Sequence, residues 1–180
     1  VDLGHRVIAK ALDDRVGCAV LIEALKRVRK PQNDLYCTFT VQEEVGLRGA
    51  RTAAFDLDPD LAIAIDVTDT GDTPEARKLA MKLGAGAAIK VKDAYLITPP
   101  RVKELLTELA EKNGIPYQFE VLPFGGTDAG AIQLTKAGVP SGVISIPCRY
   151  LHSHSEMVDL NDVEAAVRLV VAAMEHPLGG

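Results

Sequence analysis

The stretch Leu61-Ala62-Ile63-Ala64-Ile65, followed at once by Asp66, decides the fold. Five consecutive apolar residues with no polar alternation are typical of a central strand that is covered on both faces. We therefore expect a strand over Leu61–Ile65 with protein layers above and below it. The same strand ends in a carboxylate, so the sequence predicts an acidic group at the edge of the sheet.

Apolar periodicity on either side of this strand predicts alternating strands and helices. We expect strands over His5–Ala11, Leu35–Val41, Leu61–Ile65, Gly84–Val91, Tyr117–Leu122 and Gly142–Ile146. We expect helices over Val16–Arg29, Arg101–Lys112, Ala129–Ala137 and Asn161–Glu175, with a short helix or turn over Gly46–Phe55. That order predicts the α/β class, as a three-layer sandwich with a mixed, largely parallel central sheet and helices on both faces.

Composition narrows the class of protein. A chain of 180 residues fits one domain, residues 1–180, and its net charge of −5 argues against nucleic acid or an acidic membrane as partner. Aromatic residues make up only 4% of the chain, which disfavours a stacking platform for bases. No apolar run is long enough to span a membrane, and no signal peptide is visible. Three widely spaced cysteines predict reduced core residues of a cytoplasmic protein.

Acidic or imidazole groups follow four predicted elements, at Asp13-Asp14, Glu43-Glu44, Asp66 and His152/His154. Each has a simpler explanation when it is taken alone. Asp13 suits a helix N-cap, Asp66 suits an Asx-turn, and the other two segments suit solvated loops. Together they can line one edge of the sheet, where the carboxyl ends of strands gather. Oxygen-rich sites with an imidazole suit Zn²⁺, Co²⁺ or Mn²⁺.

Five motifs in order identify a family resemblance. They are Ala-Leu-Asp-Asp-Arg-Val-Gly, Val-Gln-Glu-Glu-Val-Gly-Leu-Arg-Gly-Ala, Ala-Ile-Asp-Val-Thr, Gly-Gly-Thr-Asp-Ala-Gly-Ala-Ile and Arg-Tyr-Leu-His-Ser-His-Ser-Glu. This series resembles the tetrahedral (TET), deblocking and glutamyl-type aminopeptidases, which are two-metal exopeptidases, and it covers essentially the whole chain. The resemblance implies a metal-dependent hydrolase that removes N-terminal amino acids from peptides, with two divalent ions, zinc or cobalt, as cofactors.

The resemblance also implies a role for each matching residue. Asp13 corresponds to the carboxylate that bridges both metals, and the metal ligands are Asp13, Glu44, Asp66 and His152. Asp14 corresponds to a residue that contacts the metal ligands and does not bind a metal itself. The peptide bond between Asp13 and Asp14 is often cis in this family. Glu43 corresponds to the general base. Gly125, Gly126 and Thr127 resemble the loop that borders the substrate cleft.

One departure from the family pattern concerns the second metal. The family has a further histidine ligand upstream, in a His-x-Asp motif, and an inserted small β-domain used in dimer contacts. Neither is found in this sequence, and His5 lacks the expected Asp two residues later. We therefore expect the C-terminal catalytic portion of a longer enzyme, with one metal set complete and the second incomplete. The full-length form is expected to be a homo-oligomer.

Two other functions fit parts of the sequence. A catalytically inactive metal-binding or scaffold fragment would keep the same carboxylates for structure alone. A nucleotide-binding α/β domain fits worst, because Gly84-Ala85-Gly86 and Gly125-Gly126 lack a complete phosphate-loop pattern.

Overall fold

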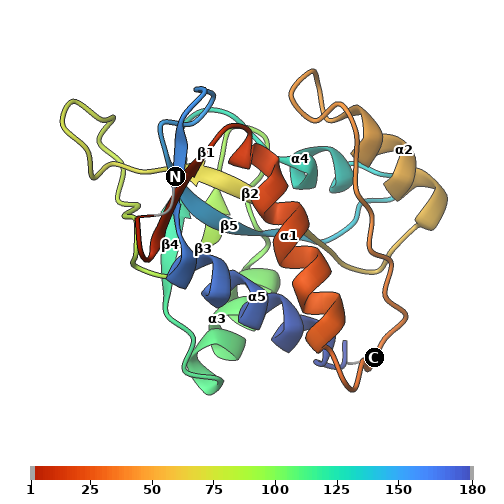
Figure 1. Ribbon diagram of the computed structural model, residues 1–180. Helices are drawn as coiled ribbons and strands as arrows, with labels where there is room; N and C mark the ends of the chain where they lie inside the picture. Colours follow the sequence, from red (N-terminus) through yellow and green to blue (C-terminus); the bar gives the residue numbers. More distant parts are fainter. Residues whose placement is uncertain (1–2, 179–180) are drawn as a thin grey trace.

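A six-stranded sheet forms the centre of the structure, a computed structural model in which residues 3–178 are described (Figure 1). The strands are β1 (Arg6–Ala9), β2 (Ala62–Asp69), β3 (Ala87–Lys92), β4 (Tyr117–Val121), β5 (Ser141–Arg149) and β6 (Glu156–Asp159). The helices are α1 (Leu12–Arg27), α2 (Arg48–Leu57), α3 (Pro100–Lys112), α4 (Asp128–Ile132) and α5 (Leu160–Met174). Among the described residues, no helix has both the length and the apolar content needed to cross a membrane.

The sheet is mixed, as predicted. Its order is β1-β6-β5-β3-β4, and β2 pairs with β5. The pairs β2–β5 and β3–β4 are parallel, whereas β1–β6, β5–β6 and β3–β5 are antiparallel. Antiparallel pairing is therefore more frequent than the sequence predicted, because β6 turns back against β5 and adds β1 to that edge.

Helices cover both faces of the sheet, which confirms the three-layer α/β architecture. The larger core joins β5 residues such as Ile144 and Ile146 to apolar side chains of α1, α3 and α5. A smaller core on the opposite face joins Val143 to Ala64 of β2 and Ala129 of α4. Helices α2 and α4 lie together, apart from α1, α3 and α5 (Figure 1).

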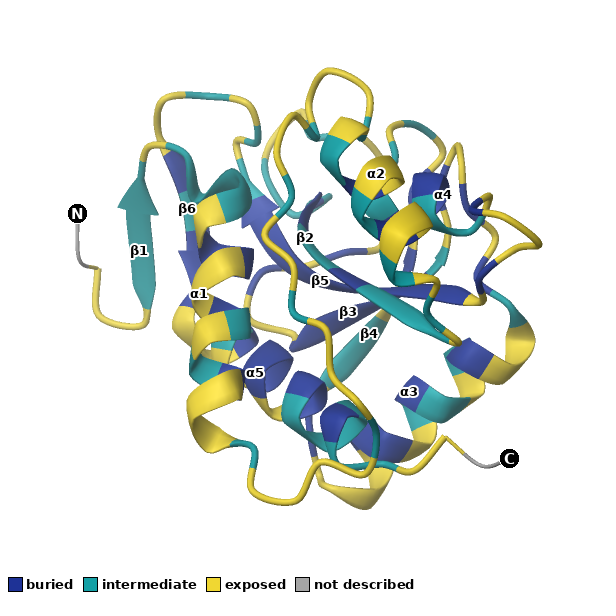
Figure 2. Ribbon diagram, turned by 90° about the vertical axis from the view of Figure 1, so that its right-hand side faces the viewer, coloured by how far each residue is buried: buried dark blue, intermediate teal, exposed yellow. Residues whose placement is uncertain are grey.

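The strand predicted over Leu35–Val41 is wrong. This segment contains no strand, and no strand of residues 3–178 pairs with it. Tyr36 is 62% exposed and Val41 66% exposed. In Figure 2 the chain between α1 and α2 runs as an irregular, mostly exposed segment. Sequence alternation reports which way side chains point, whereas a strand also needs a neighbouring backbone ladder.

Two strands, β2 and β5, extend beyond their predicted ends, and one strand was not predicted. β2 continues to Asp69, so Asp66 lies within the strand, opposite Ser145 of β5, and not after its end. β5 continues through Pro147 to Arg149. Pro147 is tolerated because it falls between the residues that pair with β3 and those that pair with β6, where no ladder bond on that side is required. The sequence did not predict β6.

The helices agree better with the prediction, except at α4. That helix ends at Ile132, and a series of turns replaces its predicted second half. The three cysteines are free thiols, but only Cys148 is a buried core residue; Cys18 is exposed and Cys37 is partly buried.

Candidate metal centre

Four segments that are far apart in the sequence meet at one edge of the sheet. Asp13-Asp14 opens α1 directly after β1, and Glu43-Glu44 lies in the turn before α2. Asp66 lies in β2, and His152 lies in the loop between β5 and β6. The side chains of Asp13, Asp14, Glu44, Asp66 and His152 form two overlapping groups of potential metal ligands that share Asp13.

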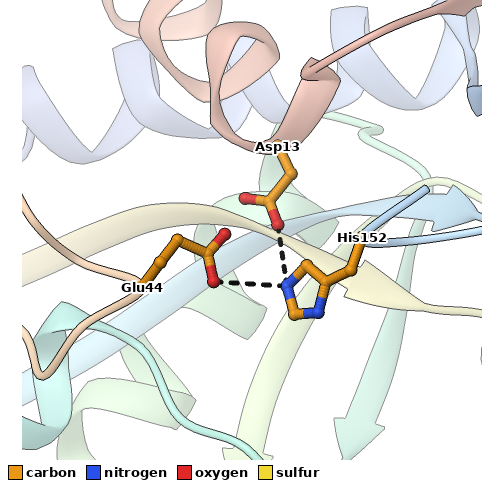
Figure 3. Close-up of side chains that lie close together, drawn as sticks. All are labelled: Asp13, Glu44 and His152. Carbon is orange, nitrogen blue, oxygen red and sulfur yellow. Dashed lines mark ion pairs between the residues drawn. The ribbon is translucent and has the colours of Figure 1, made fainter. Parts of the chain in front are cut away.

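The first group consists of Asp13, Glu44 and His152 (Figure 3). The Nε2 atom of His152 lies 3.2 Å from Asp13 Oδ2 and 3.4 Å from Glu44 Oε2. A tetrahedral ion with ligand bonds of about 2.1 Å separates its ligand atoms by about 3.4 Å. Both the spacing and the donor set, two carboxylates and an imidazole, therefore fit a zinc-type ion.

The second group consists of Asp13, Asp14 and Asp66, whose ligand atoms lie within 4.8 Å of one another. The peptide bond between Asp13 and Asp14 is cis. One oxygen of Asp14 accepts the Gly17 N–H at 3.1 Å, which fixes the orientation of this carboxylate. All three donors are carboxylates, a set that suits a hard cation better than zinc.

The carboxylates crowd one another in a partly buried site. Burial, together with the charge of Glu44, raises the pKa of Asp13 to about 6. Burial raises the pKa of Asp14 to about 8, partly opposed by the hydrogen bond from Gly17. The pKa of Asp66 is raised by burial and by the neighbouring acids Asp14 and Glu43. A divalent cation would relieve the repulsion among these carboxylates, so the chemistry of the cluster fits such ions.

Glu43 lies beside the two groups without belonging to either. Its carbonyl oxygen accepts the Gly46 and Leu47 N–H groups, so a tight turn holds it before α2. Burial, followed by the charges of Glu44, Asp128 and Asp13, raises the pKa of Glu43 to about 7. A half-buried carboxylate with this pKa can exchange protons near neutral pH.

The predicted substrate loop Gly125–Thr127 leads into α4. Its close packing requires glycine at position 126, where a Cβ would lie 2.2 Å from a ring carbon of Tyr95. Thr127 is buried and precedes Asp128, whose charge raises the pKa values of Asp14 and Glu43. The loop is therefore anchored next to the acidic cluster, and its contact with substrate stays a prediction.

Sequence reasoning missed two acidic residues of this region. The carboxylate of Glu156 accepts the backbone N–H groups of Asp13 and His152. The charge of Asp128, the first residue of α4, helps to raise the pKa of Glu43. Glu156 does end the Arg-Tyr-Leu-His-Ser-His-Ser-Glu motif, but nothing in the motif shows that its side chain turns back toward the chain's first helix.

The remaining histidines of interest lie outside both groups. His154 is exposed and takes part in neither group. His5 is exposed in the segment before β1 and does not replace the missing imidazole of the second group among the described residues.

Fold and site together define an α/β domain that gathers carboxylates and an imidazole, groups that could hold a divalent metal, at one edge of a mixed sheet. Residues 2–169 match the M42 glutamyl aminopeptidase family, and the chain belongs to that family. The resemblance stated from the sequence is thereby confirmed.

Known proteins similar to this chain are about twice as long. A candidate aminopeptidase of Acetivibrio thermocellus is 56% identical over 171 residues, which cover 95% of this chain and 52% of that protein. The structure of aminopeptidase APDkam598 from the archaeon Desulfurococcus kamchatkensis is 48% identical, with a TM-score of 0.95, and the match covers 98% of this chain and 51% of that one. The Pyrococcus horikoshii TET1 peptidase, described as assembling into a tetrahedron or a large octahedral shell, is 38% identical with a TM-score of 0.83; the match covers 94% of this chain and 50% of that one.

Proposed function

We propose that this chain is the metal-binding catalytic portion of an aminopeptidase that removes N-terminal residues from peptides with water, using Glu43 as general base. The observation that carries the proposal is the meeting of Asp13, Glu44 and His152 around the His152 Nε2 atom, with Glu43 beside them. Membership of the M42 glutamyl aminopeptidase family supports the same reaction.

Asp13, Glu44 and His152 would hold one divalent ion, zinc or cobalt, and Asp13 with Asp66 would hold part of the coordination of a second. When bound, such ions polarise the scissile carbonyl and lower the pKa of water. Asp14 would help to orient the metal ligands, because the Gly17 N–H donates a hydrogen bond that fixes the Asp14 carboxylate. Because the second set contains carboxylates only, the first set should be the tighter one.

Glu43 is suited to move the proton. Its carboxylate takes a proton from the attacking water and delivers it to the leaving amine nitrogen, so the ionised carboxylate is restored after each cycle. The pKa near 7 set by its surroundings keeps both protonation states accessible at neutral pH. No serine or cysteine is needed as nucleophile.

Peptides are the proposed substrates, with Gly125, Gly126 and Thr127 bordering their binding cleft. A free α-amino group is cationic at neutral pH and would be attracted by the crowded carboxylates of this edge. That attraction gives a physical reason for cleavage at the N-terminus.

The test is hydrolysis of amino-acid anilides in the presence of Zn²⁺ or Co²⁺. The Glu43→Gln substitution should lower kcat by about 10²–10⁴-fold, the range for loss of a general base. Glu108→Gln changes an exposed residue of α3 and should leave kcat unchanged. Unchanged activity in Glu43→Gln would overturn the general-base assignment.

The second candidate function is a metal-binding fragment without catalysis. It is favoured by one observation, the absence of an imidazole from the second group of described residues. One tightly bound ion per chain, with no anilide hydrolysis under any metal, would support this alternative over the enzyme.

Assembly and compartment are proposed on separate grounds. The P. horikoshii TET1 peptidase forms large shells, so we propose that the full-length form of this chain is a homo-oligomer as well. The three free thiols suit a reducing compartment such as the cytoplasm.

A further inference from the structure

Glu156 connects two segments that supply proposed metal ligands. It is the first residue of β6 and is 2% exposed. One carboxylate oxygen accepts the Asp13 N–H at 3.0 Å, and the other accepts the His152 N–H at 3.0 Å. A single buried side chain therefore joins the start of α1 to the loop between β5 and β6.

Strand pairing holds Glu156 in this place. In the antiparallel β1–β6 ladder, Glu156 lies opposite Ala9, the last residue of β1. Asp13 follows Ala9 by four residues. The ladder therefore holds the Glu156 carboxylate beside the backbone N–H of Asp13. His152 has a φ of 58°, in the left-handed region that non-glycine residues rarely adopt, and its N–H points at Glu156. The hydrogen bond helps to hold this backbone conformation.

We infer that Glu156 is a positioning residue that sets the spacing between Asp13 and His152 before a metal ion binds. The 3.2 Å between Asp13 Oδ2 and His152 Nε2 matches the spacing that two ligands of one ion require. A site arranged in advance loses less conformational freedom on binding, so affinity rises without an additional ligand. This inference rests on the proposed metal-binding role of Asp13 and His152, and Glu156 itself touches neither metal nor substrate.

We call the two hydrogen bonds from the Asp13 and His152 N–H groups to Glu156 the clamp. The Glu156→Gln substitution disrupts the clamp while keeping the size of the side chain. Glutamine has nearly the shape of glutamate but only one acceptor oxygen, so its NH₂ group must face either the Asp13 or the His152 N–H. One of the two hydrogen bonds is then replaced by a contact between two donors. A buried carboxylate that accepts backbone N–H groups generally stabilises the fold. Glu156→Gln should therefore also lower the free energy of unfolding.

Asp162 provides a matched control in the same chain. It is 0% exposed, and its two oxygens accept the Gly84 N–H at 2.6 Å and the Gly86 N–H at 2.7 Å. Asp162→Asn therefore breaks a clamp of the same chemistry in a place that holds no proposed ligand. A purely structural role for Glu156 would make the two variants behave alike.

The experiment is a calorimetric titration of the metal-free protein with Zn²⁺, alongside thermal unfolding of each variant. Glu156→Gln should weaken Zn²⁺ binding by about 10–100-fold, the usual effect of losing a partner behind a metal ligand. Asp162→Asn should lower Tm and leave the Kd within about 3-fold of the unsubstituted chain. Equal Kd values for Glu156→Gln and the unsubstituted chain, or equal weakening in both variants, would overturn the inference.

A second variant covers the case in which Glu156→Gln does not fold. Glu156→Asp keeps both oxygens but withdraws them by one methylene, so the carboxylate cannot reach both N–H groups, and Zn²⁺ binding should again weaken at least about 10-fold. Unchanged affinity in that variant would overturn the inference. Zinc binding without peptidase activity would overturn the proposed reaction and leave the clamp standing, whereas no zinc binding to the unsubstituted chain would overturn both.

Discussion

At the scale of single residues, His152 is the ligand whose role is easiest to test. Its side chain is 70% exposed, yet its Nε2 faces two carboxylates, and nothing in a packed core explains that orientation. We expect His152→Ala to weaken Zn²⁺ binding by at least about 100-fold, more than the loss of a partner behind the ligand. Titration with Zn²⁺ measures the change.

His154 is the natural control for that substitution. It is exposed, lies two residues away and belongs to neither ligand group. His154→Ala should leave Zn²⁺ binding unchanged. If His154→Ala abolishes binding while His152→Ala does not, the assignment of the imidazole ligand must be exchanged.

At the scale of elements, a buried charge network joins four strands behind the site. The Nζ atom of Lys90 in β3 lies 2.6 Å from Oε1 of Glu120 in β4. The Glu120 carboxylate also accepts hydrogen bonds from the hydroxyl groups of Thr68 in β2 and Ser145 in β5. Ser145 lies opposite Asp66 in the β2–β5 ladder. Lys90→Met should lower the free energy of unfolding by about 3–5 kcal/mol, because it leaves Glu120 as an unpaired buried charge.

Urea denaturation measures this loss of stability. Lys92 provides the control, since it lies in the same strand and is exposed. Lys92→Met should change the free energy of unfolding by no more than about 0.5 kcal/mol. A loss below about 1 kcal/mol in Lys90→Met would mean that the network does not hold the strands together.

At the scale of the whole molecule, the acidic cluster should make the metal-free protein less stable as pH rises. Burial raises the pKa values of Asp13, Asp14 and Glu43 to about 6, 8 and 7, above their unfolded values of 3.8, 3.8 and 4.5. The folded state therefore binds more protons than the unfolded state between about pH 4 and pH 8, so the stability falls across this window. We expect the Tm in chelator to drop by several degrees from pH 5 to pH 8.

Calorimetric scans with chelator and with Zn²⁺ check this expectation. A bound cation favours the ionised carboxylates, so the Tm should fall less, or rise, over the same range when Zn²⁺ is present. Below about pH 4 the stability should fall as the pH is lowered further. Hydrogen bonds from Arg149 and Leu83 lower the pKa of Asp72 to about 2, so protonation of this carboxylate removes stability there. A Tm in chelator that rises steadily from pH 5 to pH 8 would contradict the proposed source of the effect.

The sequence by itself determined the class of fold and most residues of the candidate site. A continuous apolar strand before Asp66 and helix-spaced apolar residues elsewhere suffice to predict layered α/β structure, because burial follows local patterns. The acids and the imidazole were found because they occur in motifs that resemble those of an aminopeptidase family, although Asp66 lies within β2 and not after its end. Asp13, Glu44 and His152 then proved to be neighbours in space.

Only the tertiary structure decided which groups face one another. Strand pairing removed Leu35–Val41 from the strands and added β6, since a ladder depends on a partner strand, and one partner of β6 is β1 at the other end of the chain. The clamp by Glu156 and the charge network around Glu120 join residues more than 20 positions apart. The physical reason is burial, because a buried charge without a partner is costly in free energy. Each buried charge therefore needs a partner that is close in space, and the local sequence pattern does not indicate which residue that is.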